Sequence, residues 1–347
     1  MIPSEIKLTQ FSIAGGCGCK VPNNLVSDIV KNISLSDNKN IVADFRHNED
    51  SAIVKINDDQ YMVYSVDFFT PIVDDPEMFG RIAAANAISD IYSKGAQPAF
   101  ALSILGFPQE FDNTDIPGKI TAGANKLCDE LNVSILGGHT IHNPQVIFGL
   151  SVVGFARKEQ LKFNNTAKPG DLIYMTKPLG TGVMSTAQKK GSLFPDDEQQ
   201  MLKYMSKPNT LGAVLGNHAF VNCMTDITGF GLVGHLSEIC DSSNVSAKIE
   251  FNKIKLLPNL EEYIEMGIVT KGGQTNWENN RHNLNGIGDF TAKVISDPQS
   301  NGGLLMTVDP AFRKEFEGIL VQNDLADFTE PIGEITKKKD LLLDIIM

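Results

Sequence analysis

The stretch SVDFFTPIVDDPEMFGRIAAANAISDIY, residues 65–92, determines how the first half of the chain folds. Apolar and polar residues alternate as it begins, which predicts a strand over 61–66 that ends at Asp67. A loop rich in Asp and Pro follows, and a helical pattern then runs over 77–93 with Gly95 as its stop. The stretch therefore predicts a strand and a long helix joined by a short polar loop.

The elements on either side of this unit alternate between strands and helices. A strand over 51–56 precedes it, and the Asn57-Asp58-Asp59 turn makes the two strands a hairpin. Such alternation gives an α/β or α+β layer fold, and the hairpin argues against a purely parallel sheet. The other predicted elements of this half are strands over 99–105, 133–136 and 146–156, a helix over 115–131, and a short helix over 22–33 with Leu25, Ile29 and Ile33 on one face.

The polar segment 166–171 predicts a join between two domains, because polar, Pro and Gly residues cluster there between apolar strands. We expect an arm over 1–20, an N-terminal domain over 21–160 and a C-terminal domain over 168–347. Residues 267–290 are rich in Gly and Asn and predict a long loop. The remaining predicted elements are helices near 182–190, 197–205, 210–219, 232–241 and 310–323, and strands near 172–175, 245–251, 294–296, 304–308, 330–335 and 341–345, with a turn at 297–303.

The segment Gly15-Gly16-Cys17-Gly18-Cys19-Lys20 is predicted to be a flexible arm that carries a soft nucleophile. Glycine adopts positive φ easily and lets the backbone approach a ligand closely. The Lys20 ammonium should favour the thiolate of Cys17 and Cys19, and thiolate is the nucleophilic form. A surface CxC that binds stray metal is the competing interpretation of this segment.

The composition of the chain excludes several classes of protein. Its 347 residues suffice for two domains, and 42% of them are hydrophobic, as is typical of globular proteins. The net charge of −12 argues against nucleic acid as a partner, since that needs clustered Lys and Arg. No apolar run approaches the ~20 residues of a membrane span, and no secretory signal is visible. Five cysteines, an odd number, argue against a disulfide framework, so we expect a cytoplasmic protein.

Four carboxylates, Asp50, Asp67, Asp90 and Asp226, are candidate metal or nucleotide ligands. Each sits at a strand end, on a helix face or beside glycine. Magnesium prefers a few carboxylates together with phosphate oxygens, which such a set could supply. Turn capping is the competing interpretation for any single Asp.

Two glycine-rich segments are candidate phosphate sites. Gly137-Gly138-His139-Thr140 follows a predicted strand, and its N–H groups could form a nest for phosphate oxygens. A tight turn with a partly buried His is the alternative. Thr228-Gly229-Phe230-Gly231 opens a predicted helix, whose N-terminus could bind an anion.

Several segments together resemble selenophosphate synthetase, the selenide, water dikinase family. The resemblance runs from about Ile6 to the last strand, and the Cys-Gly-Cys-Lys arm distinguishes this family from its fold relatives. It implies a two-domain aminoimidazole ribonucleotide synthetase-like fold of the α/β (α+β) class, and a homodimer whose N-terminal sheets pair into a barrel. The segments are KLTQFS, GGCGCK, residues 65–92, ILGGHT, KPLGTGV, MTDITGFGLVGHLSE and DPQSNGGLL.

The resemblance also implies a reaction and the residues that perform it. ATP, selenide and water would give selenophosphate, AMP and phosphate, with Mg²⁺ as cofactor and K⁺ as a candidate second cation. Cys17 would be the catalytic residue, and Lys20 would contact the phosphates. Asp50, Asp90 and Asp226 would hold magnesium. ATP contacts would also come from Asp67, Asp90, Gly138, His139 and Thr140, and from His47, Asn48 and Glu49, where the chain departs from the family's threonine-arginine-aspartate pattern.

Two other functions stay open on these residues. The chain could be a different ATP-dependent enzyme of the same superfamily, of the purine or thiamine pathway type. It could also be a non-catalytic selenium or metal carrier that uses its CxC. The Cys-Gly-Cys-Lys arm argues against the first function, and the aspartate set, which a carrier would not need, argues against the second.

Overall fold

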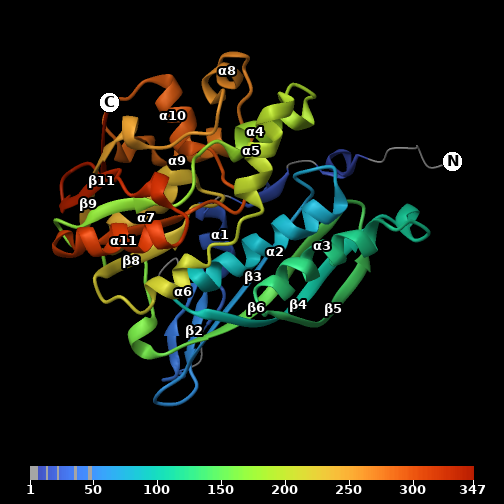
Figure 1. The fold of residues 1–347 in the computed structure, drawn as a ribbon, viewed down its shortest axis with the longest axis horizontal. Coiled ribbons are helices and arrows are strands. Elements are labelled where there is room, and N and C mark those ends of the chain that lie inside the picture. Colours follow the sequence, from blue (N-terminus) through green and yellow to red (C-terminus); the bar gives the residue numbers. More distant parts are fainter. Residues whose placement is uncertain (1–6, 13–14, 22, 35–36, 46–48) are drawn as a thin grey trace.

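The computed structural model describes residues 7–12, 15–21, 23–34, 37–45 and 49–347. The chain forms two lobes, each built around a sheet of six strands, and helices lie between and around the sheets (Figure 1). No helix in these described ranges is both long and apolar enough to cross a membrane. The α/β prediction is confirmed by this mixed architecture.

The N-terminal sheet has the strand order β1-β2-β3-β6-β4-β5. Only β4 and β5 are parallel, and the predicted early hairpin is confirmed as β2 and β3. Asp67 was expected at the end of its strand, but β3 continues to Phe69, so Asp67 lies within the ladder beside β6. The strands are β1 Ile41–Ala43, β2 Ala52–Lys55, β3 Tyr61–Phe69, β4 Gln97–Phe107, β5 Ser134–His142 and β6 Ile147–Ala156.

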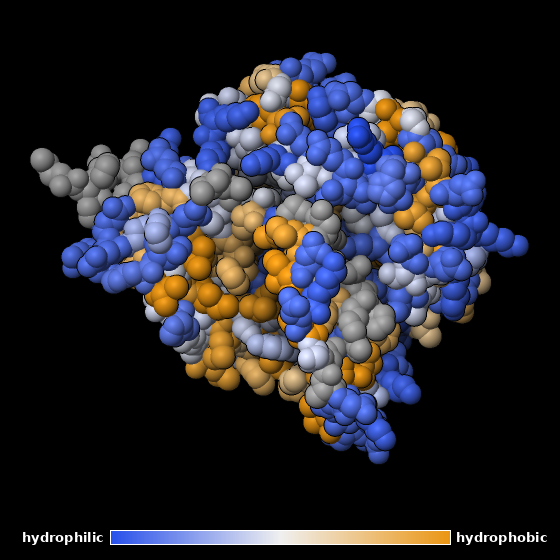
Figure 2. Space-filling model, turned by 180° about the vertical axis from the view of Figure 1, so that it is seen from behind, coloured by the Kyte–Doolittle hydropathy of each residue, from blue (hydrophilic) through white to orange (hydrophobic). Residues whose placement is uncertain are grey.

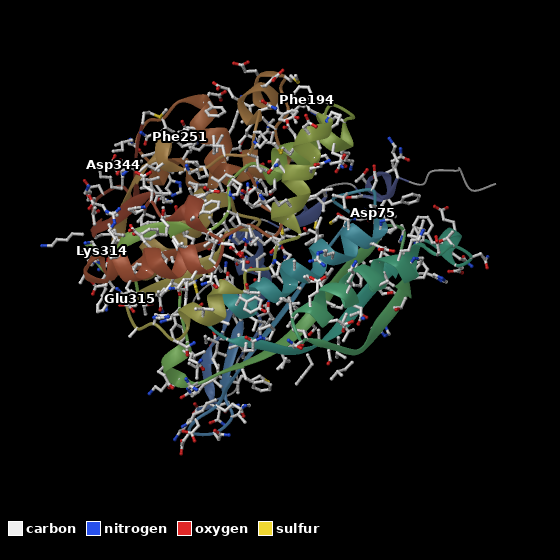
Figure 3. The ribbon with its side chains drawn as sticks, in the orientation of Figure 1. Asp75, Phe194, Phe251, Lys314, Glu315 and Asp344 are labelled. Atoms are coloured by element: carbon white, nitrogen blue, oxygen red, sulfur yellow. The ribbon has the colours of Figure 1, made fainter. Side chains whose placement is uncertain are left out.

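Helices α2 Pro76–Ser93 and α3 Ile116–Glu130 pack together in the N-terminal lobe, and α2 contacts strands β3 and β6 (Figure 1). The α2 helix begins where predicted because the Asp75 side chain accepts a hydrogen bond from Met78 N at 2.6 Å. Figure 3 labels Asp75 at this helix start. Gly95, with φ +73°, follows the end of the helix. This arrangement fixes α2 along its length, and α2 carries much of the candidate site.

The C-terminal sheet has the strand order β12-β9-β11-β7-β10-β8 and is antiparallel except for the β12–β9 pair. Its strands are β7 Leu172–Met175, β8 Val221–Asp226, β9 Val245–Glu250, β10 Leu304–Val308, β11 Gly333–Lys337 and β12 Leu343–Ile346. The helices of this lobe are α4 Thr181–Lys189, α5 Pro195–Met205, α6 Leu211–Leu215, α7 Gly231–Ser242, α8 Leu260–Glu265, α9 Lys271–Asn280, α10 Asp289–Ser296 and α11 Arg313–Gln322.

Two predictions for the C-terminal lobe are wrong. The expected long loop over 267–290 contains helix α9, and the expected strand over 294–296 is the end of helix α10. Thr270 caps α9 by accepting a hydrogen bond from Gly273 N, and α9 packs against α7 and α10. Helix propensity is low in this Gly- and Asn-rich segment, so the cap and the tertiary packing outweigh it.

The first helix is shorter than predicted. Helix α1 spans Asn23–Val30, so Ile33 lies beyond its end. Its apolar residues Leu25 and Ile29 are 49% and 60% exposed, and Ile33 is 54% exposed. The apolar spacing therefore predicts the helix but not a buried face.

Candidate active site

One side of helix α2 meets strand β3 of its own lobe and strand β8 of the other lobe. Along this contact, polar side chains of α2 and β3 pair with the predicted aspartates in buried hydrogen bonds. Because Asp67 lies on β3, Asp90 on α2 and Asp226 on β8, the contact brings both lobes to one acidic region. The pairs are Asn86 Nδ2 to Asp67, Ser65 Oγ to Asp90 and Ser89 Oγ to Asp226.

Asp50 joins this region from the segment that precedes β2. Its Oδ2 accepts from Thr225 Oγ1 at 2.7 Å and lies 3.0 Å from Lys94 Nζ. Lys94 is 0% exposed and also pairs with Glu49 at 2.5 Å. Burial disfavours the charge on Asp50, but the Lys94 ammonium outweighs it and holds the pKa of Asp50 below its usual range. Asp50 is therefore a carboxylate fixed in its ionised form.

Among the described residues, Asp90 and Asp226 have no ion pair of this kind and lie in an excess of negative charge. Burial raises the pKa of Asp90 well above its usual range, and the neighbouring Asp226 and Asp67 raise it further. Burial, followed by repulsion from Asp50, raises the pKa of Asp226 to about 6. In the described part of the chain, Asp226 Oδ1 is buried with no hydrogen-bond partner. Such a region favours a bound cation, which would satisfy the orphan oxygen and lower both pKa values.

These carboxylates could supply part of the coordination shell of a cation, with a nucleotide supplying the remaining ligands. They do not form a complete metal site by themselves. Across the residues that the structure describes, no group of three or more His, Cys, Asp or Glu is spaced to hold a metal ion. The carboxylates instead contact Ser65, Ser89, Thr225 and Lys94. Magnesium usually takes only one or two carboxylates and completes its shell with water and phosphate oxygens.

The predicted arm lies directly against this region as a single 3-10 turn, Gly16–Cys19. Cys17 is 1% exposed; its Sγ donates to Asn86 Oδ1 at 3.2 Å, and its backbone N donates to Ser300 Oγ at 3.0 Å. Lys20 Nζ lies 3.0 Å from Asp67 Oδ2. The structure therefore brings Cys17 and Lys20 to the aspartates.

Lys20 does lower the pKa of the Cys17 thiol, as expected, but with the arm in this position it does not produce a thiolate. Burial raises the pKa of the Cys17 thiol well above its usual range, and Lys20 offsets only part of that rise. Asp67 adds a further increase, because its negative charge disfavours a second negative charge on the thiol. Burial also raises the pKa of Cys19. Both thiols are therefore protonated at neutral pH while the arm lies here.

Some residues that were predicted to contact the nucleotide are not placed beside the four aspartates. His47 and Asn48 fall outside the described residues, and Glu49 is buried against Lys94 and Asn164 N. The predicted strand end at Leu136 is wrong, because β5 continues through Gly138-His139-Thr140 as an exposed edge strand, and the phosphate contact of this segment stays a prediction. Strands β6 and β4 separate it from β3, so the segment does not meet Asp67 within one chain.

The second glycine-rich segment lies beneath the arm. Thr228 N donates to His235 Nε2 at 3.0 Å, so this N–H already has a partner. A Cβ on Gly229 would lie 3.0 Å from Lys20 Cδ and 3.2 Å from Cys17 O. The segment therefore provides a surface for the arm, and a larger residue at Gly229 would press against it.

Several residues of the site were not singled out from the sequence, among them Ser300, Asn301 and Lys94. Ser300 and Asn301 belong to the segment 297–303, which was interpreted as a turn alone, and Lys94 was not singled out. Lys94 could have been noticed as a cation at the very end of a buried helix. No local signal identifies Ser300, because its hydrogen-bond partner, the backbone N of Cys17, is far away in the sequence.

Comparisons with known proteins cover nearly the whole chain. The family AIR synthase related protein, N-terminal domain, matches residues 48–156, and AIR synthase related protein, C-terminal domain, matches residues 168–345. Selenide, water dikinase of Aeromonas hydrophila is 41% identical over 333 residues, 96% of each chain. Selenide, water dikinase of Colwellia psychrerythraea is 39% identical over 333 residues, again 96% of each.

Solved structures show the same fold at lower identity. Thiamine monophosphate kinase from Aquifex aeolicus has a TM-score of 0.65 and 18% identity, covering 93% of this chain and 96% of that one. The HypE–HypF complex gives a TM-score of 0.69 and 19% identity, covering 94% of this chain and 97% of that one. At such identities these structures support the fold alone.

Proposed function

We infer the function from one premise: this chain belongs to the selenide, water dikinase family. It is an ATP-dependent enzyme that makes selenophosphate from selenide and water and releases AMP and phosphate. One observation carries this conclusion: a Cys-Gly-Cys-Lys arm lies on an acidic region to which both lobes contribute, in a chain that matches named family members over 96% of its length.

The arm supplies a thiol and an ammonium to the reacting phosphates. We propose that the ATP phosphates take the place of Asp67 as the partner of Lys20, since a polyphosphate carries more charge than one carboxylate. Cys17 then lies beside the terminal phosphate, where its thiol would position the hydroselenide ion that attacks the terminal phosphorus, with ADP as the leaving group that is hydrolysed afterwards to AMP and phosphate. The closed arm excludes water from the first transfer. Phosphoryl transfer depends mostly on such positioning and on neutralisation of charge.

Magnesium fits the acidic region through Asp50, Asp90 and Asp226. When bound with ATP, it would supply the positive charge that screens the phosphates from these carboxylates. Asp50 is prepared for this role because Lys94 keeps it ionised. We propose that Glu49 acts through Lys94 and does not contact ATP, because its side chain is 1% exposed and already paired.

We propose that the enzyme is a homodimer and that Gly138, His139 and Thr140 contact ATP in the partner copy. The outward face of the N-terminal sheet is apolar and exposed. Val66 and Leu102 both pair with Ser151 on β6, so they lie in one row across the sheet. Orange side chains gather over this part of the molecule in Figure 2. The exposed apolar residues of these strands include Val66, Phe68, Phe100, Leu102 and Leu136.

We propose that the enzyme works in the reducing cytoplasm. All five cysteines are free among the described residues, and four of them, Cys17, Cys128, Cys223 and Cys240, are buried. A reducing compartment would keep the arm thiols available.

Phosphorus NMR of protein, ATP, Mg²⁺ and selenide tests this function. We expect AMP, phosphate and a signal from a phosphorus–selenium bond. ADP as the only final product, or turnover of a thiamine or purine substrate without selenide, would identify a different enzyme of the superfamily. Tight binding of soft metals with no ATP turnover would identify a carrier.

A further inference from the structure

The loop at residues 297–303 contacts the arm at the residue that carries the thiol. Ser300 Oγ accepts a hydrogen bond from Cys17 N at 3.0 Å, and Ser300 is 3% exposed. Asn86 Oδ1 accepts from Cys17 Sγ at 3.2 Å, and Asn86 is 0% exposed. Cys17 is thus held by one hydrogen bond to each lobe.

The loop that presents Ser300 is itself held firmly. Gln299 Oε1 accepts hydrogen bonds from Gly180 N, Thr181 N and Thr181 Oγ1 at the start of α4. Asp297 Oδ2 accepts from Gly182 N and Val183 N in the same helix turn. A Cβ on Gly302 would lie 1.9 Å from Ile227 O, so the backbone also packs closely. Ser300 is therefore fixed in place by contacts that do not involve the arm.

The Asn86 amide can take only one orientation. Its Nδ2 donates to the Asp67 carboxylate, and its Oδ1 accepts from Asn301 N at 2.7 Å. A flipped amide would direct NH₂ at the Asn301 N–H and an oxygen at the carboxylate, and both contacts would be repulsive. Cys17 Sγ therefore faces a carbonyl oxygen, which accepts a hydrogen bond and cannot donate one.

We propose that Ser300 and Asn86 are positioning residues for Cys17, with Ser300 holding its backbone N–H and Asn86 directing its Sγ–H. The closed arm thus places the thiol, in its protonated form, at one point between the lobes. Ser300 holds the backbone of the arm and Asn86 contacts the Cys17 thiol, so the effect of each residue on the reaction passes through Cys17. This proposal rests on the role proposed for Cys17 in selenophosphate synthesis, although the contacts themselves do not.

The first test replaces Ser300 by Ala. Without substrates, Cys17 should react with iodoacetamide about tenfold faster, as measured by peptide mass spectrometry, because loss of about 1.4 kcal/mol opens the arm about tenfold more often. The kcat for selenophosphate should fall about tenfold, while KM for ATP stays within about twofold. Ser300→Thr retains the hydroxyl and should restore most of the wild-type behaviour.

A second variant disturbs the same contact from the arm. Gly16 has φ +57°, and a Cβ there would lie 2.2 Å from Ser300 Oγ. Gly16→Ala should therefore reproduce both effects of Ser300→Ala. Ser185→Ala is the matched control, because Ser185 Oγ donates a hydrogen bond to Gly182 O within α4 and not to the arm in the described part of the chain. It should leave alkylation and kcat unchanged.

Two outcomes would overturn the proposal. One is an unchanged alkylation rate at Cys17 in both Ser300→Ala and Gly16→Ala. The other is a rise in KM for ATP with kcat unchanged, which would place Ser300 in nucleotide binding. A wild-type protein that makes no selenophosphate would contradict the proposed function alone, because the alkylation experiment uses no substrate.

Discussion

At the scale of single residues, the ion pair between Lys20 and Asp67 determines the behaviour of the neighbouring thiol. Although burial opposes its charge, Asp67 keeps the pKa of Lys20 well above its ordinary value. The ammonium is thus shared with a carboxylate, and the desolvated Cys17 remains a thiol. Activation of the thiol therefore requires a change around Lys20, and the arrival of ATP phosphates would be such a change.

Replacing Cys17 by Ser should abolish the synthesis but not the nucleotide site. We expect Cys17→Ser to lower selenophosphate formation ~100-fold or more, because a hydroxyl is a far weaker soft nucleophile than a thiol. The Kd for ATP, measured by calorimetry, should change less than about twofold. Cys19→Ser is the matched control and should be much milder. Normal turnover of Cys17→Ser would remove the arm from the mechanism.

The buried His235 should make the protein sensitive to mild acid. Burial lowers its pKa to about 4, and its neutral Nε2 accepts from Thr228 N. The unfolded state gains a proton near pH 6.5 and the folded state only near pH 4, so stability falls as pH drops through this interval. Between about pH 7.5 and about pH 5 the loss should be on the order of 2 kcal/mol.

Urea unfolding at these two pH values measures the His235 effect. His235→Gln should remove this part of the pH dependence, whatever its effect on stability at neutral pH. His282→Gln, on an exposed turn, is the control and should keep the wild-type dependence. Equal pH dependence in the wild type and His235→Gln would show that other groups cause the acid sensitivity.

At the scale of elements, α2 and α3 approach so closely that their backbones touch. A Cβ on Gly80 would lie 1.8 Å from Ile120 O, and one on Gly123 would lie 1.9 Å from Glu77 O. Two glycines, one on each helix, therefore permit the contact. It matters for function because α2 carries Asn86 and Asp90.

Gly80→Ala should destabilise the protein even though alanine is the better helix former. We expect a loss of about 1–3 kcal/mol in the free energy of unfolding, since the methyl group must displace the backbone of α3. Gly118→Ala is the matched control, because a Cβ there meets nothing within 4 Å. It should be neutral or stabilising by up to about 1 kcal/mol. Equal effects of the two substitutions in urea titrations would contradict the close approach.

At the scale of the whole molecule, the active site joins two lobes, and the N-terminal sheet leaves an apolar face uncovered. Asp226 and Ser300 come from the C-terminal lobe, while Asp67, Asn86 and Asp90 come from the N-terminal lobe. The proposed dimer would cover the apolar face and would supply the β5 segment that one chain cannot bring to its own Asp67.

Phe68→Glu should separate the proposed dimer. Phe68 is 45% exposed on the outward face of β3, so a buried carboxylate there would disfavour association. Analytical ultracentrifugation should show a dimer for the wild type and a monomer for the variant, and the monomer should bind ATP more weakly. Val321→Glu, at an exposed apolar position on α11, should remain a dimer. A monomeric wild type, or full ATP affinity in a monomeric variant, would contradict the contact across the interface.

Local patterns in the sequence were enough to predict most strands and helices, as with β7 and β10, whose predicted bounds match the structure. They also singled out Asp50, Asp67, Asp90, Asp226, Cys17 and Lys20 as candidates, because these residue types carry recognisable chemistry at recognisable places. Helix α9 was not predicted, because its stability comes from packing against α7 and α10 and not from the helix propensity of its residues.

The tertiary structure alone decided which groups face one another. In the folded chain Lys20 forms an ion pair with Asp67, and Ser300 accepts a hydrogen bond from Cys17 N. The segment Gly138-His139-Thr140 is separated by two strands from β3, which carries Asp67. Periodicity and turn chemistry act over a few residues, so a sequence records them directly. Desolvation and hydrogen-bond partners depend on chain segments that are distant in sequence, and for that reason the protonation of Cys17 could be determined only from the folded molecule.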